Sequence, residues 1–276
     1  MQLAYDRCGA GPPLVLLHAV GHRRQGWLPV VGRLAKHREV ISLDFPGFGE
    51  SPPLPDHLPY ELDTAVIVLS EFFASLGLDR PHVAGNSMGG LVSLVLAQRG
   101  MVRSATALSP AGLWTPMGRR VSMGMVRSVH RTARYLPPKL ATRLAQTTAG
   151  RALMTGVLFA RPDLLEPQVV LEDMRALIGA VGFGPTVAAG DKVIFTGRVP
   201  DVPVTIAWGA RDVLMRRPRA ESVIRLIPHV RLLRLPGCGH LPMNDNPDLV
   251  AHVLLTGSDP DLADWSDSRQ RVSRTR

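Results

Sequence analysis

Short apolar runs alternate with helix-like stretches over most of this chain, and this alternation constrains its fold more than any other feature. Runs of strand length occupy 14–17, 39–43, 82–84, 105–108, 202–208 and 230–235. Helical periodicity appears at 60–76, 91–98, 219–227 and 246–255. Strands that alternate with helices usually form βαβ units. The sequence therefore predicts an α/β protein with a mostly parallel central sheet flanked by helices.

One long segment departs from this pattern. Between 113 and 199 the chain has helical stretches punctuated by glycine and proline, and it has no convincing strand run. We therefore expect residues 1–112 and 200–257 to form one α/β core, with 113–199 as a helical insertion. The polar tail, 258–276, mixes aspartates with arginines and is predicted to be disordered.

The net charge of +9 is concentrated in the helical insertion. Residues 113–200 contain twelve basic and five acidic side chains. A solvated basic face explains this excess, and the alternative is a surface that steers anionic substrates or meets a membrane. We do not expect a nucleic-acid partner. We expect no stable membrane insertion, although peripheral lipid contact stays open.

A helical projection of 117–136 gives an amphipathic helix. Its basic sector contains Arg120, Arg127, Arg131 and Arg134. The broad opposite face contains Met117, Val121, Met125 and Val129. We expect this apolar face to pack inward, where its methionines could line an adaptable pocket.

Other classes of protein are disfavoured by what the sequence lacks. No stretch approaches the roughly 20 apolar residues that span a bilayer, and the N-terminus has no secretory pattern, so a cytoplasmic location is expected. Cys8 and Cys238 are expected to be free thiols. No Cys/His cluster suggests a metal site, and we expect no metal or organic cofactor.

The strongest chemical signal is the segment Gly85-Asn-Ser-Met-Gly-Gly90. It follows a predicted strand and opens a predicted helix, which is the setting of a nucleophile elbow. A serine on such a tight turn needs small neighbours, and Gly85 and Gly89 supply them. Ser87 is therefore the candidate nucleophile.

A serine nucleophile requires a base and a group that orients the base. His240 lies in a glycine-rich loop directly after the last predicted strand, and Asp212 follows the strand before it. We expect His240 to be the base and Asp212 its partner. Three other polar residues are expected to be structural: His18 and Asp44 as organisers of loops, and Asp245 as a cap of the last helix.

An acyl-transfer site also needs donors for the developing oxyanion. The backbone N–H of Met88 follows the nucleophile. By position, the N–H of Val20 in the loop after the first predicted core strand supplies the second donor.

These motifs, together with Leu14–Gly21, Asp44–Ser51, Trp208–Asp212 and Gly237–Pro242, make the chain resemble the α/β-hydrolase superfamily, in particular its capped esterase and lipase-like members. The order Ser87, Asp212, His240 is also the order in that superfamily. The resemblance implies that 113–199 folds over the site as a cap. It also implies that residues 3–6 correspond to the second strand of the family sheet and that the first strand is missing.

The sequence departs from the family pattern at the oxyanion loop, and from one subgroup of the family after His240. His18-Ala19 replaces the usual His-Gly, and Leu241 stands where carbon–carbon bond hydrolases usually have tryptophan. We therefore expect a serine esterase with a small-molecule, ester-type substrate. Carbon–carbon bond hydrolysis and cofactor-free perhydrolysis on the same triad stay open, as does a ligand-binding protein with a relic triad. The oligomeric state is left open.

Overall fold

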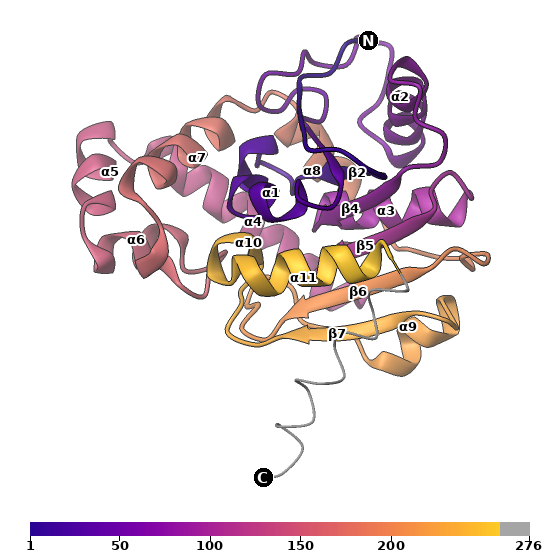
Figure 1. Ribbon diagram of the computed structural model, residues 1–276. Helices are drawn as coiled ribbons and strands as arrows, with labels where there is room; N and C mark the ends of the chain where they lie inside the picture. Colours follow the sequence, from indigo (N-terminus) through magenta and orange to yellow (C-terminus); the bar gives the residue numbers. More distant parts are fainter. Residues whose placement is uncertain (260–276) are drawn as a thin grey trace.

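The computed structural model describes residues 1–259, which build a seven-stranded sheet with helices on both faces (Figure 1). The strands are β1 (Tyr5–Cys8), β2 (Pro13–Leu17), β3 (Glu39–Leu43), β4 (His82–Asn86), β5 (Ser104–Leu108), β6 (Val204–Gly209) and β7 (Arg231–Leu235). Their spatial order is β1-β3-β2-β4-β5-β6-β7, and only the β1–β3 pair is antiparallel. The predicted α/β fold with a mostly parallel sheet is confirmed.

The strands β2 to β6 are buried on both faces, which favours apolar side chains in them, whereas the edge strands β1 and β7 are more exposed and contain arginines. In β2, Val15 and Leu17 belong to one core, and Leu14 and Leu16 belong to the other. The first core is covered by α2 (Leu62–Ser75), α3 (Met88–Gln98) and α9 (Ala220–Leu226). The second is covered by α1 (Leu28–Leu34) and α11 (Pro247–Gly257), which also contact each other.

The antiparallel strand β1 lies at one edge of the sheet. Tyr5 pairs with Leu43 of β3, and within residues 1–259 no strand pairs with the outer side of β1. This placement agrees with the resemblance, which put the first strand of this chain in the position of the second family strand. The observed strand begins two residues later than the expected range of 3–6.

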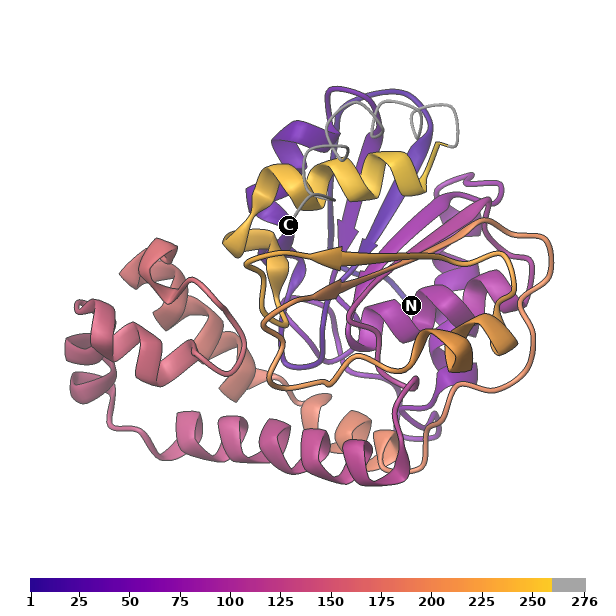
Figure 2. The same ribbon diagram turned by 90° about the horizontal axis from the view of Figure 1, so that it is seen from below.

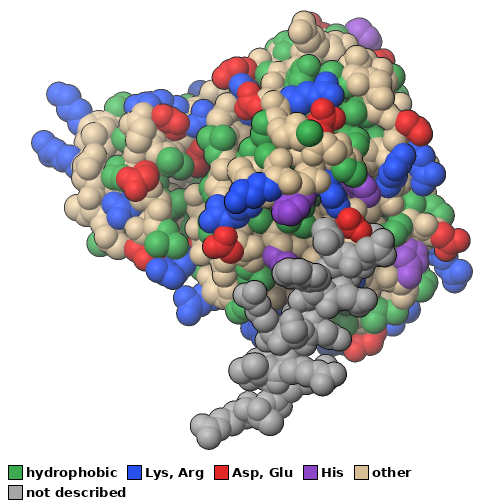
Figure 3. Space-filling model, in the orientation of Figure 1, with side chains coloured by type: hydrophobic (Ala, Val, Ile, Leu, Met, Phe, Trp, Pro, Cys, Tyr) green, Lys and Arg blue, Asp and Glu red, His purple; other side chains and the backbone are tan. Residues whose placement is uncertain are grey.

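Between β5 and β6 the chain forms helices only. They are α4 (Pro116–Tyr135), α5 (Pro138–Ala145), α6 (Thr148–Thr155), α7 (Pro167–Gly179) and α8 (Phe183–Gly190), with a short 3-10 turn at Pro162–Leu164. Figure 2 shows the long helix α4 along one side of the molecule, with α5 and α6 projecting beyond the sheet. We call this segment the inserted helices; in Figure 3 blue Lys and Arg side chains stand out on the part of it that projects from the sheet.

The orientation of α4 differs from the helical projection. Met117 and Val121 are 65% and 54% exposed, whereas Ser122 and Met123 are buried. The Ser122 hydroxyl donates to the carbonyl of Leu214 at 2.7 Å. This contact with a loop of the core turns the helix, so the expected apolar face is only partly buried. Projection from local sequence could not include a partner 92 positions away.

The remaining short elements are a 3-10 helix at Arg24–Trp27 and α10 (Pro242–Asp245). Cys8 is exposed and Cys238 is buried, and both are free thiols. Within residues 1–259 no helix is long and apolar enough to cross a membrane. The predicted disordered tail, 258–276, lies outside the described residues apart from its first two positions.

Candidate active site

Ser87 lies on the turn that joins β4 to α3, in a backbone conformation that non-glycine residues rarely adopt, with φ of 55° and ψ of −110°. A Cβ atom on Gly85 would lie 2.1 Å from the carbonyl oxygen of Gly89. A Cβ atom on Gly89 would lie 2.2 Å from the carbonyl oxygen of Leu17. Both glycines are therefore required by close backbone contacts, and the predicted tight turn is confirmed.

His240 and Asp212 meet at the carboxyl ends of β6 and β7. The Nδ1 atom of His240 lies 2.9 Å from Oδ2 of Asp212, and the two side chains are 2% and 1% exposed. The other carboxylate oxygen, Oδ1, accepts from the backbone N–H of Leu214 at 3.0 Å and of Met215 at 2.8 Å. Since the carboxylate accepts, the Nδ1 atom carries the proton and Nε2 is left with its lone pair, as a general base requires.

Asn86 links the loop of His240 to the strand that ends at Ser87. Its side-chain amide donates to the carbonyl of His240 and to that of Leu108, both at 3.0 Å. In the described residues no hydrogen bond joins the Ser87 hydroxyl to the His240 ring, and both residues are 2% exposed. Serine–histidine contacts of this kind often tighten only when substrate binds. The role of Asn86 was not predicted, although a polar residue at the buried end of a strand was a usable signal.

The two expected oxyanion donors, Val20 and Met88, line the same cavity as Ser87. Met88 is the first residue of α3, so its N–H has no acceptor within the helix. Two hydrogen bonds of His18 stabilise the loop that contains Val20. Its Nδ1–H donates to the carbonyl of Ala19 at 2.7 Å, and its Nε2 accepts from the N–H of Phe45 at 2.9 Å. Burial lowers the pKa of His18 to about 4, so the ring is neutral. The structural role expected for His18 is confirmed.

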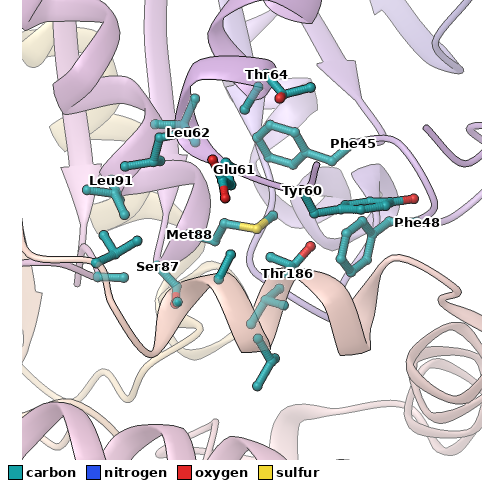
Figure 4. Close-up of a pocket in the computed structure, with 18 of the residues that line it drawn as sticks. Phe45, Phe48, Tyr60, Glu61, Leu62, Thr64, Ser87, Met88, Leu91 and Thr186 are labelled. Carbon is teal, nitrogen blue, oxygen red and sulfur yellow. The ribbon is translucent and has the colours of Figure 1, made fainter. Parts of the chain in front are cut away.

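The cavity beside Ser87 is almost entirely apolar (Figure 4). Its volume is about 110 Å³, whereas a cavity needs roughly 10–15 Å³ to hold one water molecule, so the cavity has room for several heavy atoms of a ligand. Phe45, Phe48, Tyr60 and Leu62 come from the loop after β3 and from α2, and Met123 and Val126 come from α4. Glu61 is the one charged residue among the described residues that line it. We call this cavity the acyl pocket.

Asp44 organises the loop after β3, as expected. It is fully buried, and its Oδ1 atom accepts from the N–H of Arg24 at 2.6 Å. Its Oδ2 atom pairs with the Arg24 guanidinium at 2.5 Å and accepts from the N–H of Glu50 at 2.9 Å. These contacts hold the loop that supplies Phe45 and Phe48 to the acyl pocket.

The expectation for Asp245 was wrong. The residue that caps α11 is Asn246, whose side chain accepts from the N–H of Leu249 at 3.1 Å. Asp245 instead accepts from the N–H of Gly239 at 2.7 Å, next to His240. It also accepts from the N–H groups of Ala160 and Arg161, at 3.0 and 2.7 Å. We call 236–241, the loop between β7 and α10 that contains His240, the histidine loop. Asp245 therefore joins the histidine loop to the inserted helices.

Within residues 1–259 no cluster of three or more histidine, cysteine or acidic side chains could hold a metal ion. The groups that the site offers are a strained serine, a buried imidazole–carboxylate pair, backbone donors and an apolar cavity. This set suits nucleophilic attack on a carbonyl carbon.

Comparison with known proteins agrees with this fold. The chain is 30% identical, over 253 residues, to the dihydrolipoyllysine-residue acetyltransferase component of an acetoin cleaving system from Pseudomonas putida, covering 89% of this chain and 63% of that protein. The chain thus spans less than two thirds of the length of that relative. It is 25% identical to a pimeloyl-[acyl-carrier protein] methyl ester esterase from Aeromonas hydrophila, covering 92% and 98% of the two chains.

Among solved structures, an enol-lactonase from Burkholderia xenovorans superposes with a TM-score of 0.71 at 19% identity, covering 95% of this chain and 96% of that one. A model of the alpha/beta hydrolase family matches residues 14–253. This match includes Ser87, Asp212 and His240. The chain is therefore a member of the alpha/beta hydrolase family.

Proposed function

We propose that this protein is a serine hydrolase that cleaves carboxylic esters, or related acyl compounds, with an apolar acyl part. The observation that carries the proposal is the buried His240–Asp212 pair at 2.9 Å. This pair lies at the carboxyl ends of the strands, as does Ser87, which has a strained backbone and lines the acyl pocket. The esterase named among the relatives is consistent with this class of reaction.

In the proposed mechanism Ser87 attacks the carbonyl carbon while His240 takes the hydroxyl proton. The N–H groups of Val20 and Met88 stabilise the oxyanion. His240 then protonates the leaving alcohol, which departs and leaves an acyl-enzyme. Water, deprotonated by His240, attacks the acyl carbon, releases the carboxylic acid and restores the serine. Asp212 stays ionised throughout and stabilises the imidazolium.

The lining of the acyl pocket supports a substrate with a sizeable apolar part. Aromatic and aliphatic side chains surround it, and apolar groups gain about 0.8 kcal/mol for each methylene that leaves water. We propose that 113–199 acts as a cap, because Met123, Val126 and Val187 of the inserted helices complete this cavity. A cytoplasmic location and a small-molecule substrate stay predictions.

The first experiment is labelling with a fluorophosphonate probe. The native chain should label, and Ser87→Ala and His240→Ala should not. The matched controls are Ser70→Ala and His252→Ala, which change exposed residues and should label like the native chain. Absence of labelling in the folded native protein would refute an activated Ser87 and favour a ligand-binding protein.

The second experiment identifies the bond that is cleaved. A series of p-nitrophenyl esters from acetate to dodecanoate should show kcat/KM rising with chain length until the pocket is full. A strict preference for acetate would contradict the assigned pocket. If esters are poor substrates of a protein that labels, carbon–carbon bond substrates and peracid formation become the next assays, since both use the same triad.

A further inference from the structure

A second cavity lies on the inserted helices, next to the acyl pocket. It is bounded by Arg127, His130 and Arg134 of α4 and by 178–188, which runs from the end of α7 into α8. Its volume is about 440 Å³. We call it the α4 cleft. Nothing in the proposed hydrolysis of esters uses it.

The charge of the α4 cleft is positive. Two of its lining residues are arginines, and none of its described lining residues is acidic. Arg127 is paired with Asp191 through one terminal nitrogen, and within residues 1–259 its other two guanidinium nitrogens have no recorded acceptor. For the side chain of Arg134 no acceptor is recorded within residues 1–259, and this residue is exposed. A guanidinium group with free donors at the edge of a cleft is suited to bind a carboxylate or a phosphate, because its planar donors match the oxygens of both.

The walls of the α4 cleft are apolar. Phe183, Val187 and Ile178 line it, together with Val181, which is 65% exposed. The His130 ring stacks on that of Phe183, with centroids 4.2 Å apart and planes 13° apart. Burial, and then the charge of Arg134, lowers the pKa of His130. The ring is therefore neutral near pH 7 and extends the apolar wall, while the arginines supply the charge.

The α4 cleft and the acyl pocket are neighbours but separate. Along α4, Met123 and Val126 line the acyl pocket, and Arg127 and His130 line the cleft. Val187 of α8 lines both. Figure 2 shows α4 passing α8 along this side of the molecule. A basic cleft with apolar walls is chemically different from the apolar cavity at Ser87.

We propose that the α4 cleft is a binding site for amphiphilic anions, in which Arg127 and Arg134 bind a carboxylate or phosphate and the wall formed by His130, Phe183 and Val181 takes the adjoining apolar chain. The proposal does not depend on hydrolysis at Ser87, since no residue of the triad lines the cleft. A general basic surface would attract anions without needing an apolar part. Here the two kinds of surface meet in one cavity.

The test measures binding by calorimetry to the full chain with Ser87→Ala, which prevents turnover. The probes are decanoate and decyl phosphate, each below its micelle concentration, and decanol below its solubility limit. The acyl pocket also accepts apolar chains, so the difference between the charged probes and decanol isolates the contribution of the anion. We expect both anions, or one of them, to bind at least about tenfold more tightly than decanol.

Two double variants localise this difference. Arg127→Gln with Arg134→Gln should remove the advantage of the anions and leave the affinity for decanol unchanged. Arg120→Gln with Arg131→Gln removes the same charge from the same helix, outside the lining of the cleft, and should keep that advantage. If the first pair fails to fold because Arg127 has lost Asp191, Arg134→Gln alone serves, since its side chain has no recorded partner in residues 1–259.

The outcomes separate the alternatives. Tighter binding of decanoate would indicate a fatty acid as the occupant, and tighter binding of decyl phosphate would indicate a phosphorylated lipid. Equal binding of both would show that the cleft selects charge and an apolar chain. Anions that bind no better than decanol would overturn the proposal. Equal losses in the two double variants would also overturn it, because they would assign the effect to the net charge of the inserted helices.

Discussion

Replacement of Asp245 by asparagine tests how the histidine loop is held in place. The two carboxylate oxygens of Asp245 accept three backbone N–H groups from two distant segments: Gly239 beside His240, and Ala160 and Arg161 in the inserted helices. Asparagine keeps the shape but has one acceptor oxygen, and its NH₂ group would face donors. One or two N–H groups then lose their acceptor, at about 1–3 kcal/mol each. We expect the free energy of unfolding to fall by about 2–4 kcal/mol.

The assay is unfolding in urea, followed by fluorescence and circular dichroism. The midpoint should fall, and the slope of the free energy with denaturant should not change. Because Gly239 adjoins His240, kcat should also fall while the KM for a p-nitrophenyl ester changes less. The matched control is Asp248→Asn, where a carboxylate that is 83% exposed pairs with Arg33 on the surface. Such surface pairs contribute about 0–1 kcal/mol.

Equal stabilities of Asp245→Asn and Asp248→Asn would refute this interpretation. It would mean that the three N–H groups find other acceptors, such as water, at little cost. A loss of stability with unchanged kcat would keep Asp245 as a structural link and would remove its effect on the position of His240.

Three further changes test other contacts of the site. Gly89→Ala places a Cβ atom 2.2 Å from the carbonyl oxygen of Leu17. The variant should lose about 3 kcal/mol or more of unfolding free energy and should not be labelled by the fluorophosphonate. Labelling at the native rate would contradict the close contact. His18 has its pKa lowered from 6.5 to about 4, so the unfolded chain binds its proton first as the pH falls. Above pH 6.5 the His18 ring is neutral in both the folded and the unfolded chain, so it makes no change in stability there. As the pH falls from 6.5 to 4, protonation of His18 in the unfolded chain lowers the free energy of unfolding by about 3 kcal/mol. A His18 midpoint near 6.5 in an NMR titration would show that the ring is not buried as described. Ser122→Ala removes the 2.7 Å hydrogen bond to Leu214, so the free energy of unfolding should fall by about 1 kcal/mol and kcat/KM should also fall. The control Ser128→Ala, on the exposed side of α4, should change neither quantity.

Much of the core could be predicted from residues that are close in sequence. The strand run at 39–43 coincides with β3, and the run at 230–235 differs from β7 by one residue. The run at 39–43 is mainly apolar because both faces of β3 are covered, whereas β7 is an edge strand that contains Arg231 and Arg234. Near the chain ends the prediction was weaker: the helix α1 was not predicted, although Pro29 stands in its first turn.

Part of the candidate site could also be predicted from residues that are close in sequence. Ser87 and its glycines form a local turn, and His240 and Asp212 each follow a strand by a short loop. Parallel strands end on the same side of a sheet, so the sequence predicted that His240 and Asp212 lie near each other. The pairing of β6 with β7 in the structure then brings their side chains to 2.9 Å. Their catalytic roles stay proposals until the labelling experiment is done.

The sequence by itself therefore determined the features that depend on neighbours along the chain: the strands, the tight turn at Ser87 and the loops that follow the strands. The tertiary structure alone decided which side of α4 faces inward, what Asp245 binds, and which side chains form the acyl pocket and the α4 cleft. Asp245 contacts Ala160 across 85 positions, and Ser122 contacts Leu214 across 92. Such contacts depend on how whole elements pack, and the periodicity of a single segment carries no information about its packing partner.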